Sequence, residues 1–399
     1  MEVNKIHHYD CLDGLKKLPD ESINCCITSP PYWGLRDYGE VNMRVWGNGG
    51  NCNHKWGQYE RKGTSGGKKS KKVQIKGRDN FQIVDDRTQA FCRKCGAWRG
   101  QLGLEPSPEL YVKHLADIFN EVKRVLKDDG TLWLNLGDTY NNSPAGHKTV
   151  ESLQESSTAN VGNNHQSNLN ASHSRSVIKD GVLKQKDLVG IPYRVAFALQ
   201  EQGWYLRNDI IWHKPNAMPE SVKDRCTTSH EHIFLLTKSK NYYFNQDAIR
   251  EPVTESTKER YNYGWGGNQQ RGYVNGEQNH FSDYVGTKKA KEDIKKGRNK
   301  RDVWTVTTQP FPEAHFAVYP LDLIRPCVKA GCPEDGVVLD PFMGAGTTAL
   351  VALQEDKNFM GFELNKEFID IAYKRIGQLD KEYYEELPED KKPKQQQLI

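Results

Sequence analysis

Two short stretches contain residue types that could do chemistry, and the first is Ser29-Pro30-Pro31-Tyr32, which follows the apolar run 23–27. Proline fixes its own φ, lacks an N–H donor, and pushes the preceding residue out of the helical region. The turn is therefore stiff and extended, and its carbonyls have no ladder partners. Taken alone, the motif fits two interpretations: a rigid loop capped by core aromatics, or a set of fixed hydrogen-bond acceptors.

The second stretch is VVLDPFMGAGTT, residues 337–348, which predicts a strand ending in Asp340, a glycine loop and a helix start. Small residues let the backbone approach a ligand, and the helix N-terminus presents free N–H groups. The spacing Gly344-x-Gly346 is not the dinucleotide fingerprint, and no P-loop lysine follows. Such a loop suits a nucleoside with a small zwitterionic tail. Glu363, at the end of the next predicted strand, is placed to bind ribose hydroxyls, with a surface turn glutamate as the alternative.

A third set of residues has the spacing of metal ligands: Cys52-x-His54 and Cys92-x-x-Cys95. Four such ligands in two close pairs suit a closed, tetrahedral structural zinc site, and free thiols are the alternative. A small region with few large apolar residues needs such a site to hold it together. Chelation is therefore predicted to destabilise residues 40–103 without directly affecting cofactor chemistry.

Composition narrows the class of protein. The chain has 399 residues, of which 36% are hydrophobic, and it contains no apolar run of membrane-spanning length. Its N-terminus lacks the apolar region of a secretory signal. The nine cysteines are scattered and odd in number, which does not fit a disulfide framework. We expect a cytoplasmic protein with no membrane partner.

Positive charge is concentrated in two segments, although the net charge is only +4. Residues 60–87 contain nine Lys and Arg against four Asp and Glu, and residues 286–301 contain eight against two. Two basic segments on an otherwise acidic chain indicate a polyanionic partner such as nucleic acid. The alternative is a pair of solvated loops.

The elements that must position these residues alternate between strand and helix at both ends of the chain. This alternation predicts one α/β sheet interrupted by insertions. Ser107 and Pro108 start a helix with a clear apolar period, and Gly130 is expected to end it. Residues 40–103 look irregular, and 141–186 read as a long loop that could order over a substrate. The other predicted strands are 22–28, 131–137, 204–212, 231–239, 336–340 and 358–364, and the other helices are 188–201, 321–330, 347–354 and 366–379.

With both motifs in this order, the chain resembles the β-class amino-group DNA methyltransferases that use S-adenosylmethionine. The resemblance implies a Rossmann-like, doubly wound, mostly parallel seven-stranded sheet with a zinc-knuckle insert and a target-recognition insert. The expected divisions are a catalytic half (1–39 and 104–250), the zinc insert with its basic loop (40–103), a recognition region (251–302), a cofactor-binding half (303–379) and a charged tail (380–399).

The resemblance also implies roles for single residues. Ser29 and the Pro30 carbonyl would accept the amine hydrogens of a base extruded from duplex DNA, Pro31 would keep the turn rigid, and Tyr32 would stack on the base. Asp138, which ends a strand, is either a pocket residue or a plain turn aspartate. Asp10 would bind the adenine amine of the cofactor. The full implied cofactor set is Asp10, Phe316, Pro320, Asp340, Phe342, Gly344, Gly346, Thr347, Thr348 and Glu363.

The target base follows from the serine. In this family Thr-Ser-Pro-Pro-Tyr accompanies N4-cytosine methylation and Asp-Pro-Pro-Tyr accompanies N6-adenine methylation, so Ser29 favours cytosine, with adenine as the alternative. Methylation of RNA bases or of glutamine fits the motif order less well. A non-catalytic DNA-binding zinc protein with a relic fold is a more remote alternative. The recognition sequence, a homodimer and a cognate restriction endonuclease are left open.

Overall fold

The computed structural model describes residues 1–35, 38, 40–47, 52–56, 90–141, 182–263, 272–274, 277–279, 292, 294–309 and 318–386. The basic run 60–87, most of the loop expected at 141–186, and Phe316 lie outside these ranges. No helix in the described part of the chain is long and apolar enough to cross a membrane.

A single eight-stranded sheet forms the centre of the molecule, in the order β1-β13-β12-β2-β6-β8-β7-β11. β8 runs antiparallel to both of its neighbours, and every other pair is parallel. The mostly parallel fold is as expected, but the strand number of seven was wrong. The edge strands β1 and β11 have three residues each, too few for a periodic pattern to reveal them. The strands are β1 (Lys5–His7), β2 (Ile23–Thr28), β6 (Leu126–Leu136), β7 (Tyr205–His213), β8 (His230–Thr237), β11 (Val303–Thr305), β12 (Val337–Asp340) and β13 (Asn358–Phe362).

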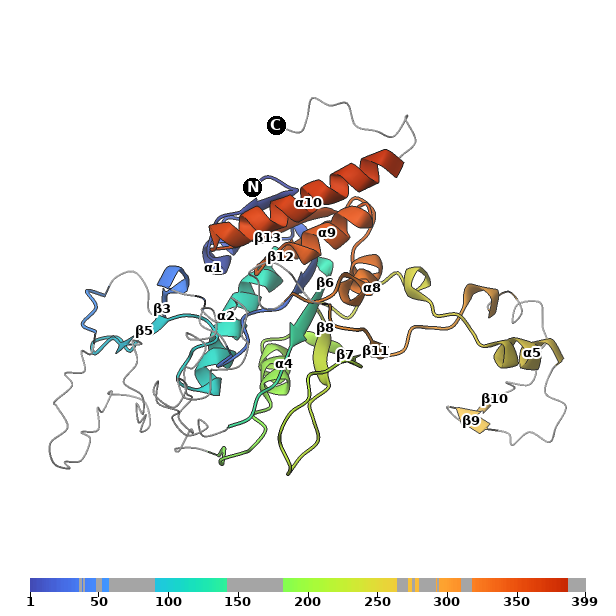
Figure 1. Ribbon diagram of the computed structural model, residues 1–399, viewed down its shortest axis with the longest axis horizontal. Coiled ribbons are helices and arrows are strands. Elements are labelled where there is room, and N and C mark those ends of the chain that lie inside the picture. The colour runs from blue at the N-terminus through green and yellow to red at the C-terminus, as the bar shows by residue number, and fades with distance from the viewer. Residues whose placement is uncertain are drawn as a thin grey trace, which may run out of the picture.

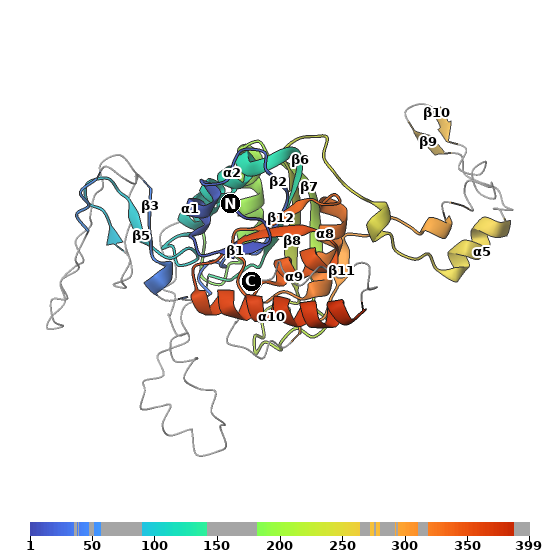
Figure 2. The ribbon, with the colours of Figure 1, turned by 90° about the horizontal axis from the view of Figure 1, so that it is seen from above.

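Helices cover both faces of this sheet (Figures 1 and 2). α1 (Cys11–Leu15), α2 (Pro108–Val125) and α4 (Ile191–Glu201) share one apolar cluster with the strands. α8 (Leu321–Gly331), α9 (Thr347–Gln354) and α10 (Lys366–Glu386) share the other. α10 continues to Glu386, past its predicted end at 379. The result is a three-layer sandwich with the sheet in the middle.

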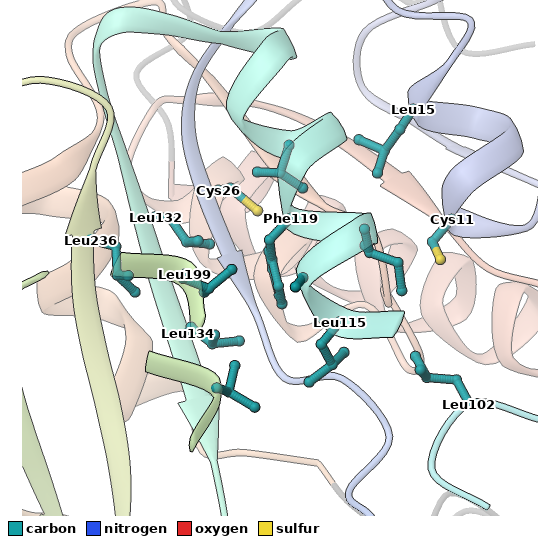
Figure 3. Close-up of a cluster of buried hydrophobic side chains, with 14 of the residues drawn as sticks. Cys11, Leu15, Cys26, Leu102, Leu115, Phe119, Leu132, Leu134, Leu199 and Leu236 are labelled. Carbon is teal, nitrogen blue, oxygen red and sulfur yellow. The ribbon is translucent and has the colours of Figure 1, made fainter. Parts of the chain in front are cut away.

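β2 is a largely apolar run because both faces of the strand are buried in the core. Neighbouring residues of a strand point to opposite faces, so Cys25 packs in the α8 layer and Cys26 in the α2 layer. Figure 3 shows Cys26 beside Phe119 of α2, with Leu115 further along the same helix. Phe119 is fully buried, and truncating such a residue to alanine costs about 3–5 kcal/mol of stability.

The start of α2 is as predicted, and its end is not. Ser107 Oγ accepts a hydrogen bond from Leu110 N at 3.3 Å, and Pro108 begins the helix. The helix stops at Val125 rather than at Gly130, because Leu126 has extended backbone and already pairs with Ile23 of β2.

Two further regions project from opposite sides of the sandwich in both views (Figures 1 and 2). Residues 40–103, expected to be irregular, contain a three-stranded antiparallel sheet of order β3-β5-β4. On the other side lie α5 and the β9–β10 hairpin. Their bounds are β3 (Arg44–Trp46), β4 (Ala90–Phe91), β5 (Trp98–Gly100), α5 (Glu255–Tyr263), β9 (Gly272–Val274) and β10 (Glu277–Asn279), with short 3-10 turns at Glu40–Asn42 and Asp247–Ile249.

Candidate functional site

The two motifs meet at one cavity of about 710 Å³. β2 and β12 are parallel neighbours, so the turn after β2 and the glycine loop after β12 emerge at the same edge of the sheet. All four residues from Ser29 to Tyr32 line the cavity, as do Phe342, Gly344, Thr347 and Glu363. Segments from the two ends of the chain therefore build a single site.

Asp340 links the two segments from inside the protein. Its carboxylate accepts hydrogen bonds from Thr28 Oγ1 and Thr348 Oγ1, each at 2.6 Å. Tyr319 OH (3.2 Å) and the Phe342 amide (3.0 Å) also donate to it. Asp340 is 1% exposed, and burial raises the pKa of its carboxyl group, which these hydrogen bonds oppose. Asp340 and Thr348 are thus supports of the loop and do not line the cavity.

The glycine loop is held by Glu363 at the end of β13. The Gly344 amide donates to one carboxylate oxygen of Glu363 at 2.9 Å, and the Asn365 amide donates to the other at 2.8 Å. Burial raises the pKa of this carboxyl group. Glu363 therefore both orders the loop and faces the cavity, where its remaining lone pairs can accept hydroxyl hydrogens.

Other members of the implied cofactor set lie elsewhere. Gly346, with φ +77°, precedes α9, and a Cβ there would lie 2.7 Å from the Cβ of Ala372 on α10. Pro320 is the N-cap of α8. Neither residue lines the cavity, and Phe316 is outside the described residues. Packing between helices, rather than ligand approach, explains the glycine at 346.

Asp10 lies at the cavity and is the N-cap of α1. Its carboxylate accepts a hydrogen bond from Leu12 N at 2.9 Å and forms an ion pair with Arg44 of β3. Burial is the largest influence on Asp10 and raises the pKa of its carboxyl group, although Arg44 opposes the shift.

The turn Ser29–Tyr32 is fixed at its second proline, while the carbonyl of its first proline stays available. Tyr111 OH donates to the Pro31 carbonyl at 2.8 Å, which fixes the second proline. No described residue donates a hydrogen bond to the Pro30 carbonyl. Ser29 Oγ lies next to it and donates to Tyr32 OH at 3.3 Å. Both Ser29 and Pro30 line the cavity.

The Tyr32 hydroxyl belongs to a polar network that sequence reasoning missed. It donates to Glu231 Oε2 at 2.7 Å and accepts from Asn135 Nδ2 at 2.6 Å. Lys214 Nζ forms an ion pair with the other Glu231 oxygen. Burial raises the pKa of Tyr32, and the Glu231 charge adds to the shift. The tyrosine ring packs against Gly137, where an added Cβ would lie 2.6 Å from the ring.

A sequence signal for Lys214 and Glu231 did exist. Lys214 directly follows β7, and Glu231 stands near the start of β8, ahead of its apolar stretch 233–236. Because these strands are antiparallel, the end of one and the start of the other meet at the same edge. A charged residue beside a predicted apolar strand was the available indication.

Asp138, considered above as either a pocket residue or a turn aspartate, supports the backbone and also lies at the cavity. Its carboxylate accepts hydrogen bonds from the amides of Gly190 and Ile191, each at 3.0 Å, and so caps α4, which has no cap from its own Gly190. It also lines the cavity.

The four predicted metal ligands converge. The ligand atoms of Cys52, His54, Cys92 and Cys95 all lie within 4.8 Å of one another. Cys52 Sγ and Cys92 Sγ are 3.9 Å apart, and Cys95 Sγ is 3.4 Å from His54 Nδ1. A tetrahedral zinc ion would place two sulfurs about 3.8 Å apart and a sulfur and a nitrogen about 3.5 Å apart. The donor set fits zinc in both chemistry and spacing.

The known proteins to which this chain is similar in sequence are DNA methyltransferases. A family model described as DNA methylase matches residues 23–374. The type II methyltransferase M.Cfr9I of Citrobacter freundii is 38% identical over 92% of this chain and 85% of its own length. M.SmaI of Serratia marcescens is 36% identical over 92% of this chain and 88% of its own length. Among solved structures, the cytosine-N4-specific PvuII DNA methyltransferase matches with 15% identity and a TM-score of 0.49, covering 93% of this chain and 85% of that one.

Proposed function

Because the chain belongs to the N6/N4 DNA methylase family, we propose that it transfers a methyl group from S-adenosylmethionine to the exocyclic N4 of a cytosine extruded from duplex DNA. The observation that carries the proposal is the shared cavity, in which the Ser29–Pro30 acceptors and the glycine loop with Glu363 line the same space. Ser29 supports cytosine, since aspartate at this position accompanies adenine in the family that the motif resembles.

The acceptors would act on the amine of the base. An exocyclic amine is a poor nucleophile because its lone pair is delocalised into the ring. Ser29 Oγ and the Pro30 carbonyl would accept its two hydrogens, draw the nitrogen towards tetrahedral geometry and free the lone pair for attack. Since the prolines and the Tyr111 bond to Pro31 fix the turn, little reorganisation accompanies the reaction.

The opposite part of the cavity would hold the cofactor. S-adenosylmethionine supplies an electrophilic methyl group on its sulfonium sulfur. Glu363 would accept the ribose hydroxyls, Asp10 the adenine amine, and the backbone around Gly344 would allow close approach. The cavity volume of about 710 Å³ lies within the range typical of small-molecule sites.

Nucleoside analysis of methylated DNA tests the proposal. Duplex DNA is incubated with the protein and S-adenosylmethionine that carries a labelled methyl group, and the nucleosides are separated by mass spectrometry. We expect label in N4-methylcytosine. Label in N6-methyladenine would support the alternative target, and cofactor binding without transfer to any DNA would favour a non-catalytic protein.

We also propose a structural zinc ion at the four-residue cluster, which is supported by the convergence of its ligand atoms. All four positions of a tetrahedral ion would be filled, so the metal would stabilise the insert and take no part in methyl transfer. Elemental analysis of the purified protein should find one zinc per chain, and a Cys95→Ser variant should lose it. A metal-free wild-type protein would contradict this.

Target recognition by residues 251–302 remains a prediction. A homodimer and a cognate restriction endonuclease likewise remain predictions.

A further inference from the structure

The insert that carries the metal cluster contacts the catalytic core through β3. Arg44 on β3 reaches α1, where its guanidinium pairs with Asp10 and also with Asp13 at 2.9 Å. The side chains of Arg44 and Asp10 are only 22% and 17% exposed. An ion pair so shielded from water is stronger than one on the surface, so Arg44 holds Asp10 in one orientation at the cavity.

β3 also supplies part of the cavity wall. Trp46 lines the cavity and is 5% exposed. Its indole N–H donates to the Gly100 carbonyl of β5 at 3.0 Å, and its ring stacks on His114 of α2 with centroids 4.3 Å apart. Asn42 and Leu102, on either side of this small sheet in sequence, line the same cavity. The insert is therefore built into the site.

The metal cluster organises the same small sheet. Cys92 and Cys95 lie in the turn that joins β4 to β5, where Gly96 at φ +75° allows its amide to donate to the Cys92 carbonyl at 2.9 Å. Cys52 and His54 follow β3. An ion bound by all four would tie the segment after β3 to the β4–β5 turn. Strands of two or three residues are short, so the ion would act together with the packing of Trp46 and Trp98 on His114 to fix their relative positions.

We propose that the insert is part of the cofactor site: the bound metal fixes β3, and Arg44 on β3 positions Asp10 for the adenine of S-adenosylmethionine. Arg44 is a positioning residue, because it acts through Asp10. The inference rests on the proposed function, since it takes that cofactor as the ligand. It adds to the expectation that chelation would not directly affect cofactor chemistry, because the effect proposed here passes indirectly through β3 and Arg44.

Calorimetric titration of S-adenosylmethionine into the full-length protein tests this. Arg44→Met should weaken binding about tenfold or more, and Arg44→Lys, which keeps the charge, should recover part of the loss. At saturating cofactor, kcat should stay close to the wild-type value, because the change affects binding of the cofactor and not the acceptor pair. Arg99→Met is the matched control: Arg99 is an exposed residue of β5 over Trp56, away from the cavity, and its loss should leave the affinity unchanged.

The second measurement is the cofactor affinity of metal-free wild-type protein. It tests the inference even if the Arg44→Met variant fails to fold. Wild-type protein stripped by a chelator should lose cofactor affinity to a similar degree and regain it when zinc is restored. Unchanged affinity in folded Arg44→Met, or in protein shown to be metal-free, would overturn the inference while leaving the proposed function intact. A wild-type protein that binds no S-adenosylmethionine would instead overturn the proposed function, and this inference with it.

Discussion

The hydroxyl of Tyr32 lies where Ser29, Asn135 and Glu231 meet. In a cavity of low dielectric, each of these groups needs its partner, because an unpaired buried polar group costs about 1–3 kcal/mol. The network thus keeps Ser29 beside the Pro30 carbonyl and fixes the tyrosine ring against Gly137. The stacking role expected of Tyr32 and this anchoring role are compatible, since the ring face and the hydroxyl are different parts of the side chain.

Tyr32→Phe tests the anchoring role. The variant keeps the ring and removes the hydroxyl, so Asn135 and Glu231 lose their shared partner and keep only their direct hydrogen bond at 3.0 Å. We expect stability to fall by about 1–3 kcal/mol and single-turnover methyl transfer to slow at least tenfold. Tyr193→Phe is the control, since its hydroxyl bonds to Asp209 at an exposed site. Equal effects of the two changes on transfer would show that the network has no special role.

A second pair of residues sets a pH dependence of stability. Glu105 and His114 are both buried, and Glu105 Oε1 lies 2.8 Å from His114 Nδ1. Burial raises the pKa of Glu105 to about 8 and lowers the pKa of His114 to about 3. The pair is thus a neutral hydrogen bond at pH 7, with the carboxylic acid as donor. The Gly103 amide donates to the other Glu105 oxygen at 2.8 Å.

The direction of this pH dependence follows from the protons that Glu105 and His114 bind in the folded and in the unfolded protein. Between pH 4.5 and pH 8 folded Glu105 retains a proton that the unfolded chain loses, so its contribution to stability decreases as pH rises. Neutral His114 gives the opposite trend, which ends near pH 6.5. From pH 6.5 to 8 the free energy of unfolding should therefore fall by up to about 1.4 kcal/mol per pH unit. Glu105→Gln can donate to the histidine without ionising and should remove this fall. Thermal unfolding of the wild-type protein and of Glu105→Gln at pH 6.5 and pH 8 measures this fall in stability. An identical fall in the two proteins would contradict the prediction.

At the scale of elements, α10 supports the glycine loop from behind. Arg375 donates to the Ala345 carbonyl and to Thr347 Oγ1. The same helix contacts Gly346 through Ala372, and Tyr373 OH accepts from the Ile6 amide of β1 at 3.0 Å. The loop that approaches the cofactor is therefore positioned by a helix that also contributes Phe368 to the cavity lining.

Gly346→Ala should separate α9 from α10. The new Cβ would meet Ala372 at 2.7 Å, at a φ of +77° that alanine rarely adopts. Strain and overpacking together should lower stability by at least about 1–3 kcal/mol and weaken S-adenosylmethionine binding. Gly377→Ala, an exposed position in α10 with free space around it, should raise stability by up to about 1 kcal/mol. Chemical denaturation measures the stability of both variants. Equal stability of Gly346→Ala and Gly377→Ala would refute the packing role of Gly346.

At the scale of the whole molecule, cations are distributed unevenly over the recognition region. Glu251 pairs with Arg298 at 3.1 Å and with Arg301 at 3.0 Å, so part of this basic segment is neutralised within the protein. Lys295 and Lys296, on the same segment, are exposed. Among the described cations of this segment, Lys295 and Lys296 are therefore the more available for phosphate, because the paired ones would first have to leave a carboxylate.

Salt dependence of DNA binding measures how many cations contact phosphate. Replacing both Lys295 and Lys296 by alanine should reduce the slope of log affinity against log salt by up to about 2, since each phosphate contact contributes about 0.9. Lys113→Ala on α2, a lysine paired with Asp117, should leave the slope unchanged. A double variant with the wild-type slope would show that these lysines only solubilise the protein.

Sequence alone determined the family, the two motifs and most long elements, because buried strands, helix caps and glycine loops are encoded in residues close together in the chain. α9 and the start of α2 were predicted to within a residue. Gly346 and Asp340 looked like ligand contacts, and only their three-dimensional neighbours showed that they support the loop. Tertiary structure also decided that Lys214 and Glu231 join the site and that β3 of the insert reaches Asp10. Those contacts join residues far apart in the chain, and their energies depend on which surfaces pack together, which no local pattern records.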